Sequence, residues 1–411
     1  MSPTRGRLAG PDAIIVGGGL AGAAAACRLA RAGRHVVLFE REPGPHHKVC
    51  GEFLSPEAAA DLLDLGIDLA VCEPDAGCEP NVGCVPNVGC VPVEAVRLTD
   101  DIRLAAAALP FRAYGLSRRR LDEMLLTRAA ALGAEIRRGV AVRAIEAGPG
   151  VMPVVRLAAG VRRAAGVRHA AGVRLSARAV FLATGKHDLR GWTRPAPAEA
   201  PVGLKLHLGL APEAAATLAR HVELHFFDGG YLGLQRIETG DANLCLVLRP
   251  DLLRRLGGRW DDVRMYLAGT SPILAERLRG TVPRWDRPLA VARIPYGYRH
   301  RGGPATGVWR LGDQTAVTPS FTGDGMAIAL ESARLAAAHF LAGGTDADYH
   351  RALGRSVGAQ LRVARVLSGV LSFGPSRGLA FGLLGLCPGL VRAGARLTRL
   401  SGAARENRAL P

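Results

Sequence analysis

A glycine-rich turn is the part of this sequence with the clearest chemical meaning. The string GGGLAG places Gly17, Gly19 and Gly22 at the G-x-G-x-x-G positions. The first glycine permits a tight turn, the second lets a phosphate approach the backbone, and the third lets the next helix pack closely on a strand. Free amides at a helix start attract phosphate charge. We therefore expect a dinucleotide phosphate site here, with Leu20 and Ala21 at the helix start.

An acid follows this turn at the expected interval. Glu40 lies about twenty residues further on, at the end of an apolar stretch, where an acid accepts hydrogen bonds from ribose hydroxyls. An acid there, rather than an arginine, favours FAD or NAD over NADP. We include the adjacent Arg41 in the predicted cofactor site.

Regular elements must hold these residues in place. Apolar runs predict strands at 12–16 and 35–40, and the Ala-rich segment 20–32 between them predicts a helix. Together they make one βαβ unit of the length that dinucleotide sites use. Ser-Pro at the start of 55–65 and the pattern of 118–132 predict two more helices.

A second pair of motifs lies far downstream. Residues 309–313 are WRLGD and residues 319–326 are PSFTGDGM. They resemble the second FAD motif of the glutathione-reductase-type flavoproteins, in the branch that contains geranylgeranyl reductases, flavin halogenases and aromatic hydroxylases. The resemblance implies that the acid contacts the ribityl chain and that the following helix start lies beside the flavin pyrimidine ring, where its dipole stabilises reduced flavin. It assigns these residues to the cofactor: Gly312, Asp313, Pro319, Gly323, Asp324, Gly325 and Met326.

Three shorter segments resemble the same branch. Arg118 begins an R-x-x-L-D helix start, and the resemblance implies that it reaches the cofactor phosphates. Val142, in a strand expected around 135–145, would line the adenine. Gly185 ends the short strand and turn FLATG at the cofactor, with Thr184-Gly185 where many hydroxylases have Asp-Gly. That departure disfavours a hydroxylase-style NADPH interaction.

The candidate catalytic residues are Cys50, His187 and His225. Cys50 lies in the sequence KVCGE, where geranylgeranyl reductases have a Cys-Gly motif near the flavin face; it either touches substrate or flavin, or is an inert packed cysteine. Either histidine is a candidate base for deprotonating a phenol, and either is otherwise structural. No metal site is expected, because none of the eight cysteines falls in a C-x2-C pair.

The order of the segments predicts an α/β fold in which a discontinuous Rossmann-like domain holds FAD. Its two parts are 1–195 and 301–345, an inserted β-sheet substrate domain is 196–300, and a helical C-terminal region is 346–411. Alternating apolar and polar residues and a turn at Asp-Gly-Gly indicate the inserted sheet.

Two segments of period six interrupt the first part. They are 75–92 and 158–175, and we interpret them as repeat expansions in surface loops. The alternative is a ligand set formed by Cys78, Cys84 and Cys90.

Charge and hydropathy limit the partners. The net charge is +17, but the arginines are spread along the chain without a nucleic-acid motif, so we expect no nucleic acid. The segment 366–391 has apolar runs too short to span a bilayer. Bounded by arginines, it is either a peripheral contact with an anionic membrane or a helical hairpin that closes the substrate lobe. We expect a cytoplasmic protein, and on the first of these two interpretations it contacts the inner face of the membrane.

These features favour an FAD-dependent monooxygenase that hydroxylates an aromatic or polyketide-type lipid, with NADPH or NADH as a transient electron donor. Residues 50–56 and 319–325 also resemble bacterial flavoproteins encoded beside type III polyketide synthases. One alternative is a geranylgeranyl-reductase-like enzyme that saturates C=C bonds of a prenyl lipid. A non-enzymatic alternative is a redox-responsive flavin-binding module. Halogenation is disfavoured because the W-x-W-x-I-P segment of flavin halogenases is absent.

Overall fold

The computed structural model describes most of the 411-residue chain, namely residues 10–69, 89–100, 102–158, 172–372, 374–387 and 389–400. Most of the two period-six segments, including Cys78 and Cys84, lies outside the described residues. The last two residues of each segment lie in a strand rather than a loop, because β4 begins at Val91 and β9 at Arg174.

A parallel sheet forms the centre of the first lobe. Within the described residues its strand order is β17-β10-β1-β2-β6, so two late segments of the chain complete the sheet begun by β1 and β2. Its strands are β1 (Ala13–Val16), β2 (Val36–Glu40), β6 (Glu135–Arg138), β10 (Ala179–Leu182) and β17 (Val308–Arg310). Three of them are uninterrupted runs of buried residues, as expected for strands covered on both faces.

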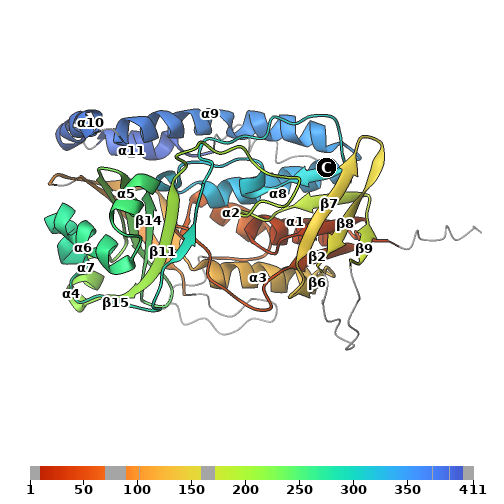
Figure 1. The fold of residues 1–411 in the computed structure, drawn as a ribbon, viewed down its shortest axis with the longest axis horizontal. Helices are drawn as coiled ribbons and strands as arrows, with labels where there is room; N and C mark the ends of the chain where they lie inside the picture. The colour runs from red at the N-terminus through yellow and green to blue at the C-terminus, as the bar shows by residue number, and fades with distance from the viewer. Residues whose placement is uncertain are drawn as a thin grey trace, which may run out of the picture.

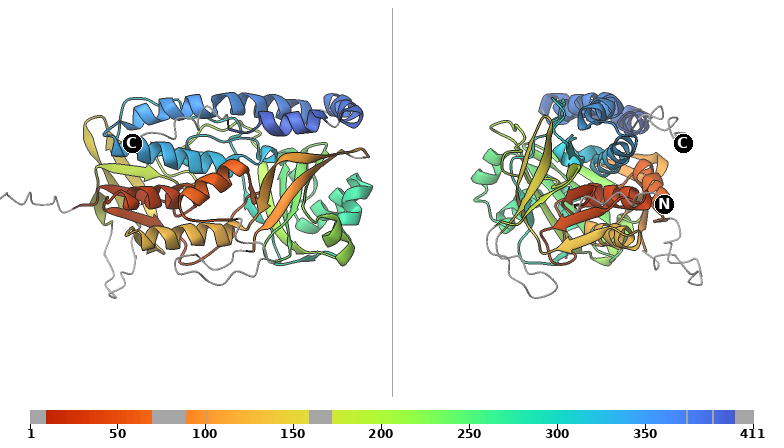
Figure 2. Two further views of the ribbon diagram at one scale, coloured as in Figure 1. Left: turned by 180° about the vertical axis from the view of Figure 1, so that it is seen from behind. Right: turned by 90° about the vertical axis from the view of Figure 1, so that its right-hand side faces the viewer.

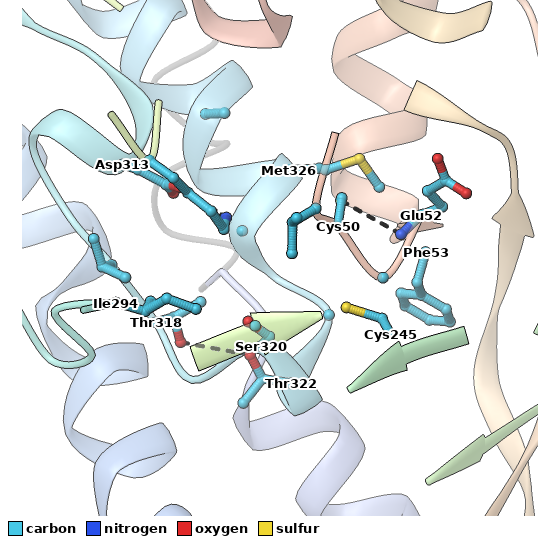
Figure 3. Close-up of a pocket in the computed structure, with 18 of the residues that line it drawn as sticks. Cys50, Glu52, Phe53, Cys245, Ile294, Asp313, Thr318, Ser320, Thr322 and Met326 are labelled. Carbon is cyan, nitrogen blue, oxygen red and sulfur yellow. Dashed lines mark hydrogen bonds and ion pairs between the residues drawn. The ribbon is translucent and has the colours of Figure 1, made fainter. Parts of the chain in front are cut away.

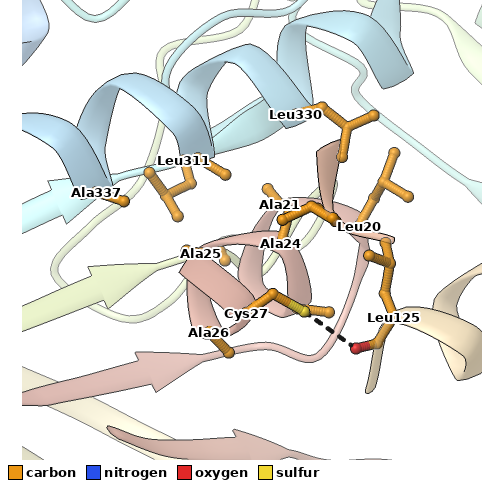
Figure 4. Packing of buried hydrophobic residues seen from close by; sticks show 14 of the residues in the cluster. Leu20, Ala21, Ala24, Ala25, Ala26, Cys27, Leu125, Leu311, Leu330 and Ala337 are labelled. Atoms are coloured by element: carbon orange, nitrogen blue, oxygen red, sulfur yellow. Dashed lines mark hydrogen bonds between the residues drawn. The ribbon is translucent and has the colours of Figure 1, made fainter. Parts of the chain in front are cut away.

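Helices from three parts of the chain cover one face of this sheet (Figures 1 and 2). They are α1 (Leu20–Arg31), α2 (Pro56–Asp64), α3 (Arg118–Ala131) and α8 (Gly325–Leu341). The α1 helix is rich in alanine and lies between α3 and α8, with Ala21, Ala24 and Ala25 among the packed side chains (Figure 4). Small side chains allow this close approach of three helices.

The glycine turn between β1 and α1 brings the helix very close to the backbone of the turn. Gly17 has φ +107°, and a Cβ built on Gly22 would lie 1.9 Å from the carbonyl oxygen of Gly17. The last glycine of the motif therefore lets the helix contact the turn itself, as the sequence predicts.

A second sheet forms the other lobe. Nine of the described strands belong to it, in the order β15-β11-β14-β13-β12-β4-β5-β3, with β16 paired to β11. The predicted domain 196–300 supplies only part of it, because β3, β4 and β5 come from residues 53–115. The strands are β3 (Phe53–Leu54), β4 (Val91–Thr99), β5 (Leu104–Gly115), β11 (Val202–Gly209), β12 (His221–Phe227), β13 (Gly230–Arg236), β14 (Ala242–Leu248), β15 (Val282–Pro283) and β16 (Leu289–Val291).

Short helices cover one face of this second sheet. Leucines of β11, β13 and β14 pack against them in one buried cluster. The helices of this lobe are α4 (Pro212–Thr217), α5 (Pro250–Arg255), α6 (Trp260–Thr270) and α7 (Pro272–Leu278). The other face is left to border a cavity.

The prediction of one continuous strand over 135–145 is wrong. This segment is two strands, β6 in the parallel sheet and β7 (Val142–Gly148) in a three-stranded sheet with β8 (Val151–Leu157) and β9 (Arg174–Ser176) among the described residues. Gly139, at φ +68°, breaks the chain between them. A left-handed residue cannot continue a strand, and glycine adopts that conformation without steric cost.

The C-terminal region is helical, as predicted. The helices α9 (Asp346–Ser372), α10 (Gly374–Leu386) and α11 (Gly389–Leu397) run along one side of the molecule (Figures 1 and 2). They contact α8 and β17 in the first lobe and β5 and β12 in the second. In the part of the chain that the structure describes, no single helix is long and apolar enough to span a membrane; α10 and α11 reach that size together but meet at a bend of 116°.

The glycine turn gives a first test. Alanine at position 22 would normally favour a helix, but here its Cβ collides with a backbone carbonyl. We expect Gly22→Ala to lower the free energy of unfolding by about 1–3 kcal/mol, as overpacking does, in a denaturant titration. Gly44→Ala is the control, because a Cβ at Gly44 meets open space; it should change stability by less than about 0.5 kcal/mol. Equal stability of the two variants would contradict the close contact.

Candidate functional site

One cavity of about 780 Å³ extends from the glycine turn to the C-terminal helices. It brings together sixteen residues that the sequence assigned to the site: Gly17, Gly19, Leu20, Ala21, Glu40, Arg41, Cys50, Arg118, Val142, Gly185, His187, Gly312, Asp313, Gly323, Gly325 and Met326. Four other predicted residues, Gly22, Pro319, Asp324 and His225, do not border this cavity.

Glu40 is held in one orientation at the first end of the cavity. Its Oε2 accepts a hydrogen bond of 2.7 Å from the Gly18 amide, and its Oε1 accepts one of 3.0 Å from the Glu42 amide. Each carboxylate oxygen has a second lone pair. The side chain is therefore positioned at the cavity wall and still has acceptor capacity for hydroxyl groups.

Two cations stand over the glycine turn. A Cβ at Gly19 would lie 3.3 Å from Lys48 Nζ and 3.4 Å from Arg118 Nη2. Both cations pair with Asp122, at 2.8 Å for Lys48 and 2.8 Å for Arg118. Burial raises the pKa of Asp122, but the charges of Arg118 and Lys48 outweigh burial and hold that pKa below its usual value. Two cations against one carboxylate leave a net positive charge at the start of α1, which suits an anion.

Lys48 was not predicted as a site residue. It lies in the same KVCGE segment as Cys50, two residues before it. The signal that could have identified it is the isolated lysine beside a predicted phosphate site. Its distance from the glycine turn, however, follows only from the folded loop.

Asp313 lies at the middle of the cavity with its own cation. Lys186 Nζ is 2.9 Å from Asp313 Oδ2, and Arg194 donates to the Asp313 carbonyl oxygen at 2.8 Å. Gln314 donates to the carbonyl oxygens of Gly185 and His187. Burial raises the pKa of Asp313, but Lys186 outweighs it, so the pKa lies below its usual value. The two predicted turns, at 185 and at 312, are thus joined.

Asp324 lies behind the cavity wall at the start of α8. It is fully buried, and Arg399 Nη2 lies 2.9 Å from its Oδ1. Burial raises the pKa of Asp324 to about 6, although Arg399 opposes the rise. The neighbouring Gly323 has φ +73°, and a Cβ there would lie 2.6 Å from the Phe53 ring. Asp324 therefore ties the end of α11 to the glycine segment, while Gly323 and Gly325 face the cavity.

The loop that carries Cys50 is fixed from the second lobe. Asn243 Nδ2 donates to the carbonyl oxygens of Cys50 at 3.1 Å and of Gly51 at 2.8 Å. Cys50, Cys245 and Met326 lie around the same space (Figure 3). Burial, with a smaller effect of Cys50, raises the pKa of Cys245 to about 12, so Cys245 stays a thiol.

A buried polar cluster supports this loop from behind. Glu52 is fully buried and has φ +58°; its carboxylate contacts Lys205 Nζ, lies 2.8 Å from His207 Nε2, and accepts a 2.7 Å hydrogen bond from the Arg118 amide. Burial raises the pKa of Glu52, but Lys205 and His207 outweigh burial and lower it. His47, Glu52 and His207 have ligand atoms within 4.8 Å of one another. The Lys205 ammonium, however, already supplies the positive charge at this carboxylate.

The two candidate histidines are in different environments. His187 borders the cavity, and its Nε2 lies 3.4 Å from Arg41 Nη2. Burial, followed by the charge of Arg41, lowers the pKa of His187. His225 is buried in the second sheet, with its ring nitrogens 2.8 Å from Thr99 and 3.3 Å from Glu223. His225 therefore has partners away from the cavity and supports the sheet.

The far half of the cavity is apolar. Strands β4, β5 and β12 form one wall, and the C-terminal helices form the other. Its side chains include Val96, Leu98, Leu109, Phe111, Val222, Leu224, Phe226, Leu367, Val370, Leu371, Leu384 and Val391. Between the two halves, hydroxyl groups form a chain from Tyr231 to Tyr296 at 3.4 Å and on to Ser320 at 2.6 Å. Burial raises the pKa of both tyrosines, so they remain protonated.

Sequence comparisons match short stretches of the chain. The family model of the NAD(P)-binding Rossmann-like domain matches residues 15–64. The menaquinone reductase of Mycolicibacterium smegmatis is 48% identical over 56 residues, which is 14% of this chain and 14% of that protein. Squalene monooxygenase SE2 of Panax ginseng is 43% identical over 65 residues, 16% of this chain and 12% of that protein. These matches therefore cover about one seventh of the length of the curated relatives.

Comparisons of structure cover almost the whole chain. The flavin-dependent brominase Bmp2 superposes with a TM-score of 0.71 at 18% identity, over 94% of this chain and 93% of that chain. The myxobacterial chondrochloren halogenase CndH gives a TM-score of 0.70 at 19% identity, over 89% and 84%.

The chain has the fold of flavin-dependent halogenases.

A third structure with this fold is halogenase PltM, solved in complex with phloroglucinol and FAD. It superposes with a TM-score of 0.68 at 18% identity, over 88% of this chain and 77% of that chain. The predicted fold class, a Rossmann-like domain joined to a sheet lobe and a helical C-terminal region, is confirmed. The shared fold does not by itself define the reaction.

The lowered pKa of His47, which borders the cavity, predicts a pH dependence of stability. Burial, together with His207 and Lys205, lowers the pKa of His47 to about 4 from 6.5. Between pH 6.5 and 4 the unfolded chain therefore takes up a proton that the folded protein does not, so stability falls as the pH falls. We expect a smaller difference in unfolding free energy between pH 7 and pH 5 for His47→Phe than for the wild type, measured by urea denaturation. An unchanged difference would show that His47 is already solvated in the folded state.

Proposed function

We propose that this protein is an FAD-dependent oxidoreductase that acts on a long apolar substrate, and specifically a monooxygenase of an aromatic or polyketide-type lipid. The observation that carries the proposal is the single cavity, which joins dinucleotide-binding turns at one end to an apolar chamber at the other. A cavity that contains both a polar cofactor end and a greasy end suits a redox enzyme of lipids.

The residues at the first end fit FAD. Cβ atoms at Gly17 and Gly22 would collide with backbone, so the turn is built for close approach, and Lys48 and Arg118 supply positive charge beside it. Glu40 keeps acceptor capacity for ribose hydroxyls. Asp313 and the start of α8 at Gly325 border the middle of the cavity, where the resemblance to flavoproteins puts the ribityl chain and the flavin ring. When bound, FAD would supply the redox chemistry, with NADPH or NADH as the proposed electron donor.

The chain's own residues provide the remainder of the site. The apolar chamber excludes water from the reacting end. The hydroxyl groups of Tyr231, Tyr296 and Ser320 form a hydrogen-bonded chain at the boundary between the polar and apolar halves of the cavity, and this chain can hold a proton there. His187, with its lowered pKa, is the cavity histidine best suited to act as a proton acceptor.

The alternative reaction is the reduction of a C=C bond in a prenyl lipid. Cys50 favours it, because its side chain borders the cavity beside Met326. One relative that matches part of this chain, over 56 residues, is a menaquinone reductase. Both named relatives, a squalene monooxygenase and a menaquinone reductase, are named for long apolar molecules. The substrate class is thus shared by both alternatives, and the reaction distinguishes them.

Product analysis separates the reactions. The purified protein is loaded with FAD and reduced anaerobically with NADPH or NADH, and then air or 18O2 is admitted with 4-dodecylphenol. Incorporation of 18O into the phenol supports the monooxygenase. Saturation of a phytyl-substituted naphthoquinone without oxygen supports the reductase. Retention of FAD with neither product favours a flavin-binding module.

We also propose contact with an anionic membrane surface through the C-terminal helices. One face of α10 exposes three leucines, Leu379, Leu383 and Leu386. The exposed fraction is 69% for Leu379 and 85% for Leu386. Leu383 also borders the cavity, so the apolar chamber reaches this face. Arg103, in the β4–β5 hairpin, donates to the Gly378 carbonyl oxygen at 2.8 Å, so a basic side chain lies against α10. An apolar face with adjacent basic residues suits a membrane interface.

The phosphate end gives a prediction on cofactor affinity. Arg118→Gln removes one of the two cations beside Gly19, and hydrogen bonds to charged groups contribute about 1.5–3 kcal/mol. We expect the Kd for FAD to rise about tenfold to a hundredfold in a fluorescence titration. Arg31→Gln is the control, because Arg31 forms an exposed ion pair at the other end of α1. If both variants bind FAD as the wild type does, Arg118 has no role in cofactor binding.

The exposed face of α10 gives a prediction on membrane binding. We expect the double variant Leu379→Asp, Leu386→Asp to lose at least about tenfold in binding to phosphatidylglycerol-containing vesicles, because two apolar side chains no longer enter the interface. Cosedimentation measures the bound fraction. Val151→Asp is the control, since Val151 is an exposed apolar residue of β8. Equal losses in both variants would refute a specific role for α10.

A further inference from the structure

The wall of the cavity contains one amide side chain in an unusual state. Gln235 lies on β13, where Tyr231, Gly233 and Gln235 alternate along the strand and border the cavity. It is 2% exposed. Neither its Oε1 nor its Nε2 has a hydrogen-bond partner among the described residues. A buried donor or acceptor left without a partner costs about 1–3 kcal/mol.

The neighbours of Gln235 do not satisfy this amide. Across the sheet it faces Val222 on β12 and Asn243 on β14. Asn243 uses its Nδ2 on the Cys50 and Gly51 carbonyl oxygens. Gly115 is also close, since a Cβ there would lie 3.4 Å from Gln235 Nε2, but it has no side chain to offer. The amide therefore has unused hydrogen-bonding capacity at a cavity wall.

The position of Gln235 relates it to both halves of the cavity. Its cross-strand neighbour Asn243 holds the loop that carries Cys50, at the flavin half. Its other cross-strand neighbour, Val222, belongs to the apolar chamber. A ligand whose tail lies in the chamber would thus present its end to Gln235 near the reacting end.

We propose that Gln235 binds the polar head of the substrate, and that this head is a hydroxylated ring such as a phenol or an enol. The inference rests on the proposed function, because it assumes a ligand with an apolar tail in the chamber. A primary amide offers a donor and an acceptor, and a hydroxyl group can meet both. A quinone carbonyl meets only Nε2 and leaves Oε1 without a partner. Gln235 only orients the head by hydrogen bonding and forms no covalent bond with it.

Matched ligands and a matched variant test this subsite. The probes are 4-dodecylphenol and dodecylbenzene, which differ only in the hydroxyl group, and their binding is followed by the change in flavin absorption of the FAD-loaded protein. The variant Gln235→Met keeps a similar volume and removes both polar atoms. We expect its Kd for 4-dodecylphenol to rise about tenfold, while its Kd for dodecylbenzene changes less than about twofold.

The contrary results are distinct. An unchanged affinity of Gln235→Met for the phenol overturns the proposal. An equal loss for both ligands also overturns it, because the variant then disturbs the cavity in general. Failure of the proposed function appears earlier, as a protein without a flavin spectrum after FAD loading, or as a wild type that binds neither ligand.

Discussion

The arrangement of this molecule depends on a fully buried ion pair between its two lobes. Glu52 belongs to the loop after the Rossmann unit, and Lys205 belongs to β11 of the second sheet; both side chains are completely buried. A buried charge is tolerated only when it is paired and hydrogen-bonded, and Glu52 also accepts from the Arg118 amide and contacts His207. This pair fixes the Cys50 loop between the lobes. The glycine turns and the second sheet therefore border one cavity rather than two.

Charge is distributed unevenly along that cavity. Lys48 and Arg118 lie at the end of the Gly17–Gly22 turn and Lys186 lies at the middle, and each has an acidic partner. The other end has aliphatic and aromatic walls. Such a gradient favours one orientation of a ligand pair, because a phosphate-bearing cofactor is attracted to the cations and an alkyl chain gains only at the apolar end. The hydroxyl groups of Tyr231, Tyr296 and Ser320 lie where the two meet.

Local motifs could be predicted from the sequence, and contacts between distant segments could not. The conformation of the Gly17–Gly22 turn is set by residues that are adjacent in the sequence and by their steric limits, so the motif alone predicted the tight turn that the structure shows. The return of β17 and α8 to the first lobe was also predictable, from the GD and PSFTGDG motifs. The second sheet was predicted in part only, because pairing of β4 with β12 joins residues more than a hundred positions apart. The only sequence signal for Lys48 was an isolated lysine beside a predicted phosphate site, and Gln235 had none, since both roles arise from the loop and strand that fold around them.

Hydrogen–deuterium exchange with FAD alone and with FAD plus 4-dodecylphenol tests the account most directly, because it reports on both ends of the cavity in one protein. We predict that FAD slows exchange at residues 17–20 and 323–326, and that the lipid then slows exchange at β12, β13, α10 and α11 without reversing the first effect. Release of the FAD-dependent protection by the lipid would mean that the two compete for one space. That result would contradict a single cavity that holds cofactor and substrate together.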